Sequence, residues 1–251
     1  MTKQRLTCYA ILGALLIGTQ GGCIFLHGQR YRHFTTRTPL PDREILVLGF
    51  MGGREPWNND ARNVRKLALK LRAMNLHQVQ IETVENQKRE LALQLIRKAF
   101  DRNQDGQLDA EERATTRLIL YGQSFGGAAV VKLARQLKAW DIPILLTVQI
   151  DSVGRGDRII PSNVRRAANL FQRNGLFIKG EKAIRPEAAD KTAIIGNYQF
   201  DYRNKNIDIS EVSWLKKIFR VAHTRMEYDP EVWAKVEALI LSEIERIKKA
   251  R

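Results

Sequence analysis

The strongest constraint on the fold is a fivefold alternation of apolar strands and amphipathic helices. Apolar runs predict strands at 44–50, 79–84, 117–122, 142–150 and 191–199. The segments between the strands predict helices at 61–74, 86–100, 127–140 and 162–172. Ser162 is the expected cap of the helix at 162–172, and a final helix is expected to begin at Asp229-Pro230. Crossovers of this length join parallel strands. We therefore expect an α/β fold in which a mainly parallel sheet is covered by helices on both faces, a three-layer sandwich.

The chain of 251 residues suits one such domain, predicted for 44–251, after a polar linker at 27–43 that contains two prolines. Its net charge is +15, from 42 Lys and Arg against 27 Asp and Glu. The basic residues lie along the polar faces of the predicted helices, and no zinc knuckle, basic zipper or RNP-type aromatic motif accompanies them. We therefore expect a solvated basic surface and no nucleic-acid partner.

The first 26 residues predict an export signal or a membrane or lipid anchor. Lys3 and Arg5 precede an apolar run at 6–18, and Gly21-Gly22-Cys23 follows. We expect an exported protein, periplasmic or at the cell surface; whether the leader is cleaved, lipidated at Cys23 or retained stays open. Both cysteines of the chain lie in this leader, so the folded domain has no disulfide and no thiol nucleophile.

Ser124 is the candidate nucleophile. It lies in Gly122-Gln123-Ser124-Phe125-Gly126, a match to G-x-S-x-G between a predicted buried strand and a predicted amphipathic helix. A sharp turn at this junction would lift the hydroxyl above the edge of the sheet, and glycines on both sides would let the strand and the helix approach. The alternative interpretation is a glycine-rich turn with an idle serine.

A serine nucleophile needs a base and an acid that orients the base. Of the four histidines, only His223 follows the last predicted strand, in a predicted loop before the final helix, and elimination favours it as the base. Asp151 directly follows the fourth predicted strand and is the favoured acid. Asp201, after the fifth strand, is its rival. The first oxyanion donor should be the N–H of Phe125, and the second that of Phe50 or Met51 in LGFMGG.

Together, LGFMGG, YGQSFGG, QIDSVG and AHTRM resemble the α/β-hydrolase superfamily over residues 44–250. Leu48 stands where lipases of that superfamily have a histidine in the first motif. The longer strings DSVGRGDRIIPSNVRRAANLFQ and MEYDPEVWAKVEALI are similar to a group of uncharacterised exported bacterial hydrolase-like proteins. This resemblance implies the triad Ser124, Asp151 and His223, and it implies no particular substrate.

A second motif predicts a Ca²⁺ site between the second helix and the third strand. DRNQDGQLDAEE, at 101–112, matches D-x-N-x-D-G-x-L-D-x-x-E and resembles an EF-hand loop. The expected ligands are the oxygens of Asp101, Asn103, Asp105, Gln107, Asp109 and Glu112. No second loop is found, and the outgoing helix has room for about two turns. We therefore expect a structural ion at the end of the sheet away from Ser124; the alternative is a decayed acidic turn.

These features predict an exported serine hydrolase that acts on carboxylic esters or lipids as small-molecule substrates, at or near a membrane surface. Thioesters and amides stay open as substrates. The alternative from another class is a non-catalytic, calcium-stabilised binding protein on a hydrolase scaffold.

Overall fold

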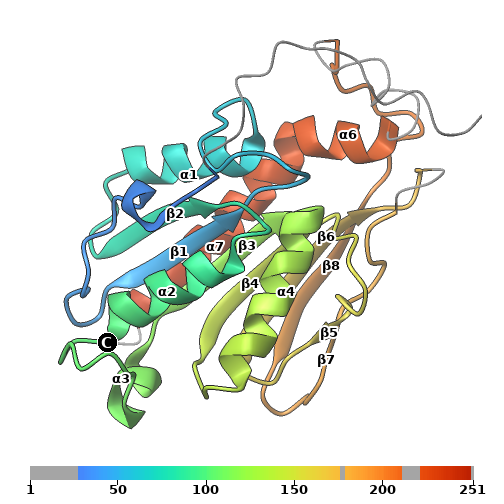
Figure 1. Cartoon of the computed structure of the whole chain (residues 1–251). Coiled ribbons are helices and arrows are strands. Elements are labelled where there is room, and N and C mark those ends of the chain that lie inside the picture. Colours follow the sequence, from blue (N-terminus) through green and yellow to red (C-terminus); the bar gives the residue numbers. More distant parts are fainter. Residues whose placement is uncertain (1–27, 176–178, 211–220, 250–251) are drawn as a thin grey trace, which may run out of the picture.

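The computed structural model describes residues 28–175, 179–210 and 221–249 (Figure 1). The predicted leader at 1–26 lies outside these residues, together with Cys8 and Cys23. Within the described ranges, no helix combines the length and the apolar character that a membrane span requires.

Six parallel strands form the central sheet. In spatial order they are β2 (Val79–Val84), β1 (Ile45–Phe50), β3 (Leu118–Gln123), β4 (Ile144–Ile150), β6 (Val164–Gln172) and β8 (Ala193–Phe200). The short strands β5 (Ile159–Ile160) and β7 (Arg185–Pro186) pair beside it. Every residue of β1, β3 and β4 is buried, as expected for strands covered on both faces.

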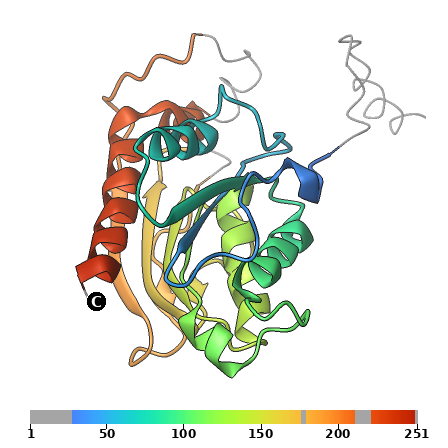
Figure 2. The same cartoon turned by 90° about the vertical axis from the view of Figure 1, so that its left-hand side faces the viewer.

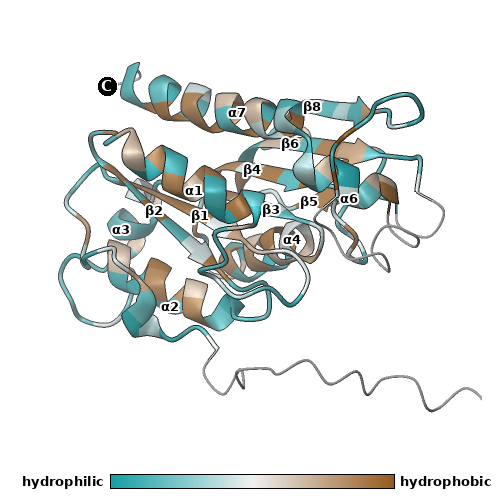
Figure 3. Cartoon of the chain, turned by 90° about the horizontal axis from the view of Figure 1, so that it is seen from above, coloured by the Kyte–Doolittle hydropathy of each residue, from teal (hydrophilic) through white to brown (hydrophobic). Residues whose placement is uncertain are grey.

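The helices form one layer on each face of this sheet (Figures 2 and 3). One layer holds α1 (Asn63–Ala73), α6 (Val221–Tyr228) and α7 (Pro230–Lys249), and the other holds α2 (Arg89–Phe100) and α4 (Phe125–Lys138). The remaining helices are the short α3 (Ala110–Thr115) and the 3-10 helix η1 (Tyr31–His33). The prediction of a three-layer α/β fold with a parallel sheet is confirmed.

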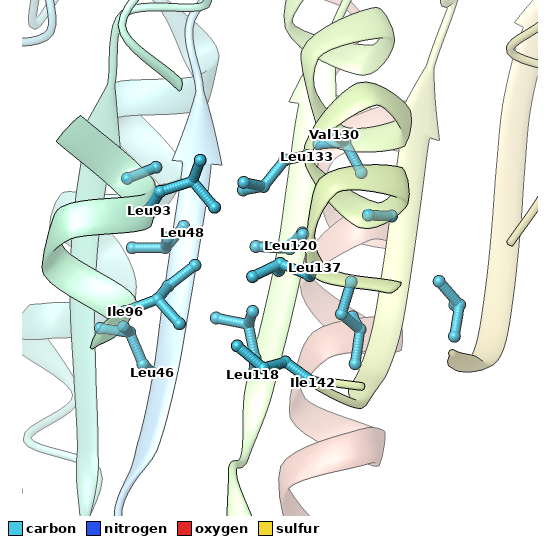
Figure 4. Packing of buried hydrophobic residues seen from close by; sticks show 14 of the residues in the cluster. Leu46, Leu48, Leu93, Ile96, Leu118, Leu120, Val130, Leu133, Leu137 and Ile142 are labelled. Atoms are coloured by element: carbon cyan, nitrogen blue, oxygen red, sulfur yellow. The ribbon is translucent and has the colours of Figure 1, made fainter. Parts of the chain in front are cut away.

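Each layer encloses its own apolar core. On the α2 and α4 side, Leu46 and Leu48 of β1 and Leu118 and Leu120 of β3 pack against leucines, valines and isoleucines of both helices (Figure 4). On the other side, alternate strand residues such as Val47 pack against α1 and α7. Continuous apolar strands are therefore required, because successive side chains enter opposite cores.

The order of the strands places a topological switch point between β1 and β3. From β1 the chain moves outward to β2 and then returns to the other side of β1 to form β3. Open α/β sheets bind ligands at the carboxyl ends of the strands beside such a point. Ser124 directly follows β3, so the predicted nucleophile lies at this position.

The prediction of a helix at 162–172 is wrong, because this segment is strand β6. The side chain of Ala167 enters one core and those of Ala168 and Leu170 enter the other, as in a strand. The apolar residues also match helical spacing, and Ser162 precedes the segment as an N-cap residue would. Pairing with both β4 and β8 decides in favour of the strand, because it satisfies the backbone on both sides.

Two further segments differ from expectation. His223 lies within α6 and not in a loop. Residues 28–43, predicted as a linker, pack against the domain: Leu40 is buried, and the backbone N–H and hydroxyl of Thr36 both donate to Glu82 of β2. The side chain of Gln29 donates to the carbonyl of Thr83 at 2.8 Å.

Candidate active site

The turn at Ser124 has the strained backbone that a nucleophile elbow requires. Ser124 joins β3 to α4 with φ 57° and ψ −119°, a region that non-glycine residues rarely adopt. Such a conformation costs about 1–3 kcal/mol and persists only when the surrounding structure holds it. Here the N–H of Ser124 donates to the carbonyl of Ile150 at 2.8 Å, which ties the elbow to the end of β4.

Gly122 and Gly126 allow the strand and the helix to meet at this turn. A Cβ atom on Gly122 would lie 2.5 Å from the carbonyl group of Gly126, and one on Gly126 would lie 2.1 Å from the carbonyl oxygen of Phe50. Both contacts are far below van der Waals distance and involve backbone, which cannot move aside. The expectation that small residues are needed on both sides of Ser124 is confirmed.

The structure brings Asp151 and His223 together beside the elbow. Gln123 and Ile150 are paired in the sheet, so the next residues, Ser124 and Asp151, leave adjacent strands at the same edge. The Asp151 carboxylate is fully buried, and its Oδ2 lies 2.6 Å from Nδ1 of His223. A carboxylate only accepts hydrogen bonds, so opposite a carboxylate Nδ1 of a neutral His223 donates and Nε2 is left as the acceptor.

Gln172 also binds this carboxylate. Its side-chain Nε2 lies 3.1 Å from Asp151 Oδ2, and its backbone N–H donates to Oδ1 over 3.4 Å. Asp151 itself has φ 45°, so it leaves β4 in a conformation unusual for a non-glycine residue. Sequence reasoning missed Gln172, because the segment that contains it was predicted as a helix.

Asp201 does not take part in this arrangement. Its side chain is exposed and pairs with the guanidinium of Arg203 two residues later. The hydrogen bonds from Arg203 lower the pKa of the Asp201 carboxyl to about 2. Of the two aspartates weighed from the sequence, the structure places Asp151 against His223.

Ser124 and His223 lie at the same sheet edge, and each is 7% exposed. Both residues lie in the described part of the chain, and the structure shows no hydrogen bond between their side chains. Hydrogen bonds between a nucleophile and its base are often long before a substrate binds and shorten only in the complex. The missing hydrogen bond therefore does not argue against Ser124 and His223 as a nucleophile and its base.

The N–H of Phe125 stays the predicted first oxyanion donor, whereas the N–H groups predicted for the second donor already have partners. Phe125 is the first residue of α4, where backbone N–H groups have no partner within the helix. The N–H of Met51, however, donates to the carbonyl of Val84 at 2.9 Å. Successive N–H groups of β1 donate alternately to its two neighbouring strands: the N–H of Ile45 donates towards β2 and that of Leu46 towards β3. By this alternation the N–H of Phe50 points to β3 and is part of the hydrogen-bond ladder. The prediction of Phe50 or Met51 is therefore wrong.

The loop at 101–112 connects α2 to α3, at the opposite end of β3 from Ser124 (Figure 1). The Glu112 carboxylate is buried and accepts hydrogen bonds from the backbone N–H groups of Arg102, Asn103 and Asp109. Oδ2 of Asp101 accepts from the N–H of Gly106 at 2.9 Å, whereas its Oδ1 is buried without a partner.

The other predicted ligands form turns along this loop. Oδ1 of Asn103 accepts from the N–H of Asp105, whose own Oδ1 accepts from the N–H of Gln107. Asp109 caps α3, because its Oδ1 accepts from the N–H of Glu112. Among the described residues, no three His, Cys, Asp or Glu side chains are grouped so as to hold a metal ion. The predicted ligands thus share one loop but do not converge on a point.

No protein family model and no curated protein sequence matches this chain. Solved structures similar to it include a cutinase-like protein from Cryptococcus sp., with 13% identity and a TM-score of 0.42 over 83% of this chain and 98% of the other. Another is a dienelactone hydrolase-like promiscuous phosphotriesterase from metagenomic libraries, with 12% identity and a TM-score of 0.39 over 82% and 88%. Similarity at this level does not define an activity for this chain.

Proposed function

We propose that this protein is a serine hydrolase of the α/β-hydrolase type that cleaves carboxylic esters. The observation that carries the proposal is the 2.6 Å contact between Asp151 and His223 at the sheet edge where the strained turn presents Ser124. A buried carboxylate paired with an imidazole beside an elbow serine is the arrangement that nucleophilic acyl transfer requires.

In this proposal Ser124 Oγ attacks the ester carbonyl while Nε2 of His223 takes the hydroxyl proton. Asp151 holds the imidazole with its Nδ1 protonated and stabilises the positive charge that forms on the ring. The N–H of Phe125, at the N-terminus of α4, stabilises the oxyanion of the tetrahedral intermediate. His223 then protonates the leaving alcohol, and water, activated by the same imidazole, releases the acyl group from Ser124.

The surface next to the nucleophile favours esters with an apolar part. The side chain of Phe125 is 50% exposed directly beside Ser124, and few large apolar side chains of the described residues are that exposed. An exposed phenyl ring gains free energy when an acyl chain or an apolar alcohol covers it. Together with the predicted leader, this supports small-molecule or lipid esters as substrates at the outer side of a membrane.

Hydrolysis of p-nitrophenyl acetate by the purified domain tests the proposal. An acyl-enzyme mechanism predicts a burst of nitrophenol followed by slower turnover. Ser124→Ala and His223→Ala should each lower kcat by at least about a thousandfold and remove the burst. Absence of turnover and of a burst in the wild-type protein would contradict the proposal and leave the non-catalytic binding protein as the explanation of the fold.

The calcium site is part of the same proposal, as a structural ion in the loop at 101–112. Its support is chemical: oxygen donors recur along the loop, and Asp101 Oδ1 is a buried acceptor without a partner, which a cation would satisfy. The Glu112 carboxylate now accepts hydrogen bonds from backbone N–H groups, and it would have to release them to bind the ion. The ion would stiffen the crossover between α2 and β3 and take no part in the reaction.

Thermal unfolding with and without Ca²⁺ tests this site. Ca²⁺ at a hundred times its Kd stabilises a one-site protein by about 2.7 kcal/mol, or roughly 5–10 °C for a domain of this size. Asp105→Asn keeps the turn to Gln107 but removes a charge, so it should reduce the shift, whereas Asp141→Asn outside the loop should not. No shift in the chelated and reloaded wild-type protein would contradict a calcium site.

A further inference from the structure

Asn86 holds the loop that follows β1 through two hydrogen bonds to backbone carbonyls. It lies just beyond the end of β2, and its side-chain Nδ2 donates to the carbonyl of Met51 at 2.9 Å and to that of Gly53 at 2.5 Å. These two carbonyls flank Gly52. The side chain of Asn86 therefore fixes the orientation of the Met51–Gly52 and Gly53–Arg54 peptide groups.

The orientation of one of these peptide groups matters for the site. In a trans peptide the C=O and N–H groups point in opposite directions. Because Asn86 binds the carbonyl of Met51, the N–H of Gly52 in the same peptide group points away from Asn86. Gly52 also lies close to the nucleophile: a Cβ atom on it would be 3.8 Å from Cβ of Ser124 and 3.3 Å from the carbonyl oxygen of Gln123.

The N–H of Gly52 is also available. It follows the last ladder bond of β1, from the N–H of Met51 to the carbonyl of Val84, and among the described residues it has no hydrogen-bond acceptor. Without a side chain at Gly52, little steric hindrance opposes rotation of the Met51–Gly52 peptide group. A hydrogen bond to the Met51 carbonyl therefore restricts rotation of this peptide group and of the N–H that it carries.

We propose that Asn86 is a positioning residue, which holds the Met51–Gly52 peptide so that the N–H of Gly52 serves as the second oxyanion donor, opposite that of Phe125. This inference rests on the proposed hydrolase function. Asn86 does not touch the substrate. It acts through the peptide that it holds, so its loss should affect the transition state more than substrate binding.

The test compares Asn86→Ala and Asn86→Asp with the wild-type protein. Removal of one oxyanion donor lowers kcat by roughly 100- to 1,000-fold. Asn86→Ala should reach this range for p-nitrophenyl acetate, with KM changed by less than about threefold, because donors of this kind act mainly in the transition state. Asn86→Asp keeps the shape but turns a negative charge towards two carbonyl oxygens, so its kcat should fall at least as far.

Asn163→Ala is the matched control. Nδ2 of Asn163 also donates to two carbonyls, those of Ala134 and Ile142, at 3.1 and 2.9 Å, away from the Ser124 edge. Its loss should lower the melting temperature about as much as the loss of Asn86 and leave kcat per active site unchanged. Active sites are counted by the burst amplitude, which separates partial unfolding from a slower reaction.

The outcomes distinguish this inference from the proposed function. A wild-type protein without a burst overturns the proposed function, and the role of Asn86 with it. A wild-type burst together with wild-type kcat per active site in both Asn86 variants overturns the role of Asn86 alone. A rise of KM as large as the expected fall of kcat, with kcat itself unchanged, also overturns it, because that pattern indicates lost substrate binding. If Asn86→Ala does not fold, Asn86→Asp decides.

Discussion

Asp151→Asn separates an orienting role of the buried carboxylate from a purely structural one. The two oxygens of Asp151 accept from three N–H groups: Nδ1 of His223 at 2.6 Å, Nε2 of Gln172 at 3.1 Å and the backbone N–H of Gln172 at 3.4 Å. Asparagine has the same shape but only one acceptor oxygen, and its other terminal atom is a donor. Whichever way the amide turns, its NH₂ group faces another donor.

The size of the effect follows from these two orientations. If the NH₂ group faces His223, the imidazole must carry its proton on Nε2, which then cannot accept the proton of Ser124. If the oxygen faces His223, the bond survives but the negative charge is gone, and a hydrogen bond to a charged group contributes about 1.5–3 kcal/mol. The combined loss should be roughly 1,000- to 10,000-fold in kcat, or about 4–5.5 kcal/mol in activation free energy.

The assay is steady-state hydrolysis of p-nitrophenyl acetate, with circular dichroism to show that the variant is folded. Asp201→Asn is the control, because Asp201 is an exposed aspartate at the same edge of the sheet that pairs with Arg203. Its kcat should stay within about threefold of wild type, as for most surface substitutions. A folded Asp151→Asn variant with kcat within tenfold of wild type would refute the assignment of Asp151 as the orienting acid.

Two predictions concern stability. Gly126→Ala places a Cβ atom 2.1 Å from the carbonyl oxygen of Phe50, so it should lower the free energy of unfolding by about 3 kcal/mol or prevent folding. Gly28→Ala is the control, because its Cβ would first meet the flexible side chain of Lys88, at 3.1 Å. Melting temperatures that fall equally in both variants would contradict this prediction. Oδ1 of Asp229 caps α7 by accepting from the N–H of Glu231, and its Oδ2 accepts from the buried hydroxyl of Tyr202. Asp229→Ala removes both hydrogen bonds. Urea unfolding should show a loss of about 2–4 kcal/mol, and a loss below about 1 kcal/mol would be too small for this account.

Tyr202 shows why the Asp229 contact matters. Burial and the hydrogen bond to Asp229 raise the pKa of the Tyr202 hydroxyl well above its ordinary value, so it stays protonated and donates at 2.8 Å. The sequence indicated Asp229 as a capping residue from the following proline, and this cap is confirmed. The link to Tyr202, 27 residues earlier, depends on tertiary structure and has no local signal.

The central strands could be predicted from sequence because both of their faces are buried. A strand between two helix layers is mostly apolar, and every residue of β1, β3 and β4 is buried, with Gln123, Thr147 and Gln149 as polar exceptions. Strand β6 could not be predicted in this way. Two of its buried residues, Asn169 and Gln172, are polar, and their partners Glu181 and Asp151 are distant in sequence. Together with Arg165 and Arg166, these polar residues interrupt the apolar pattern of the segment.

The helix that carries His223 had no periodic signal either. Ala222, His223 and Thr224 are consecutive and all buried, so α6 lacks the apolar stripe of a surface helix. His223 was identified by elimination among four histidines, which does not require its secondary structure. The elbow at Ser124 had the strongest signal, because the turn needs glycines at fixed positions and leaves a motif.

The residues that support the site were not predictable. Asn86 and Gln172 are ordinary amide residues in the sequence, and each acts through a backbone or side chain more than 20 residues away. The second oxyanion donor was expected one or two positions too early. The ladder of β1 extends through the N–H of Met51, and the exact end of a strand is set by its neighbours rather than by its own residues.

The most direct measurement of the central claim is to map the residue that a fluorophosphonate modifies. The reagent phosphonylates an activated serine, and mass spectrometry of the digested protein locates the added mass. We predict one modification, on the peptide that contains Ser124, which is absent in Ser124→Ala and strongly slowed in His223→Ala. An unmodified protein, or a label that stays elsewhere on the chain when Ser124 is replaced, would contradict the account.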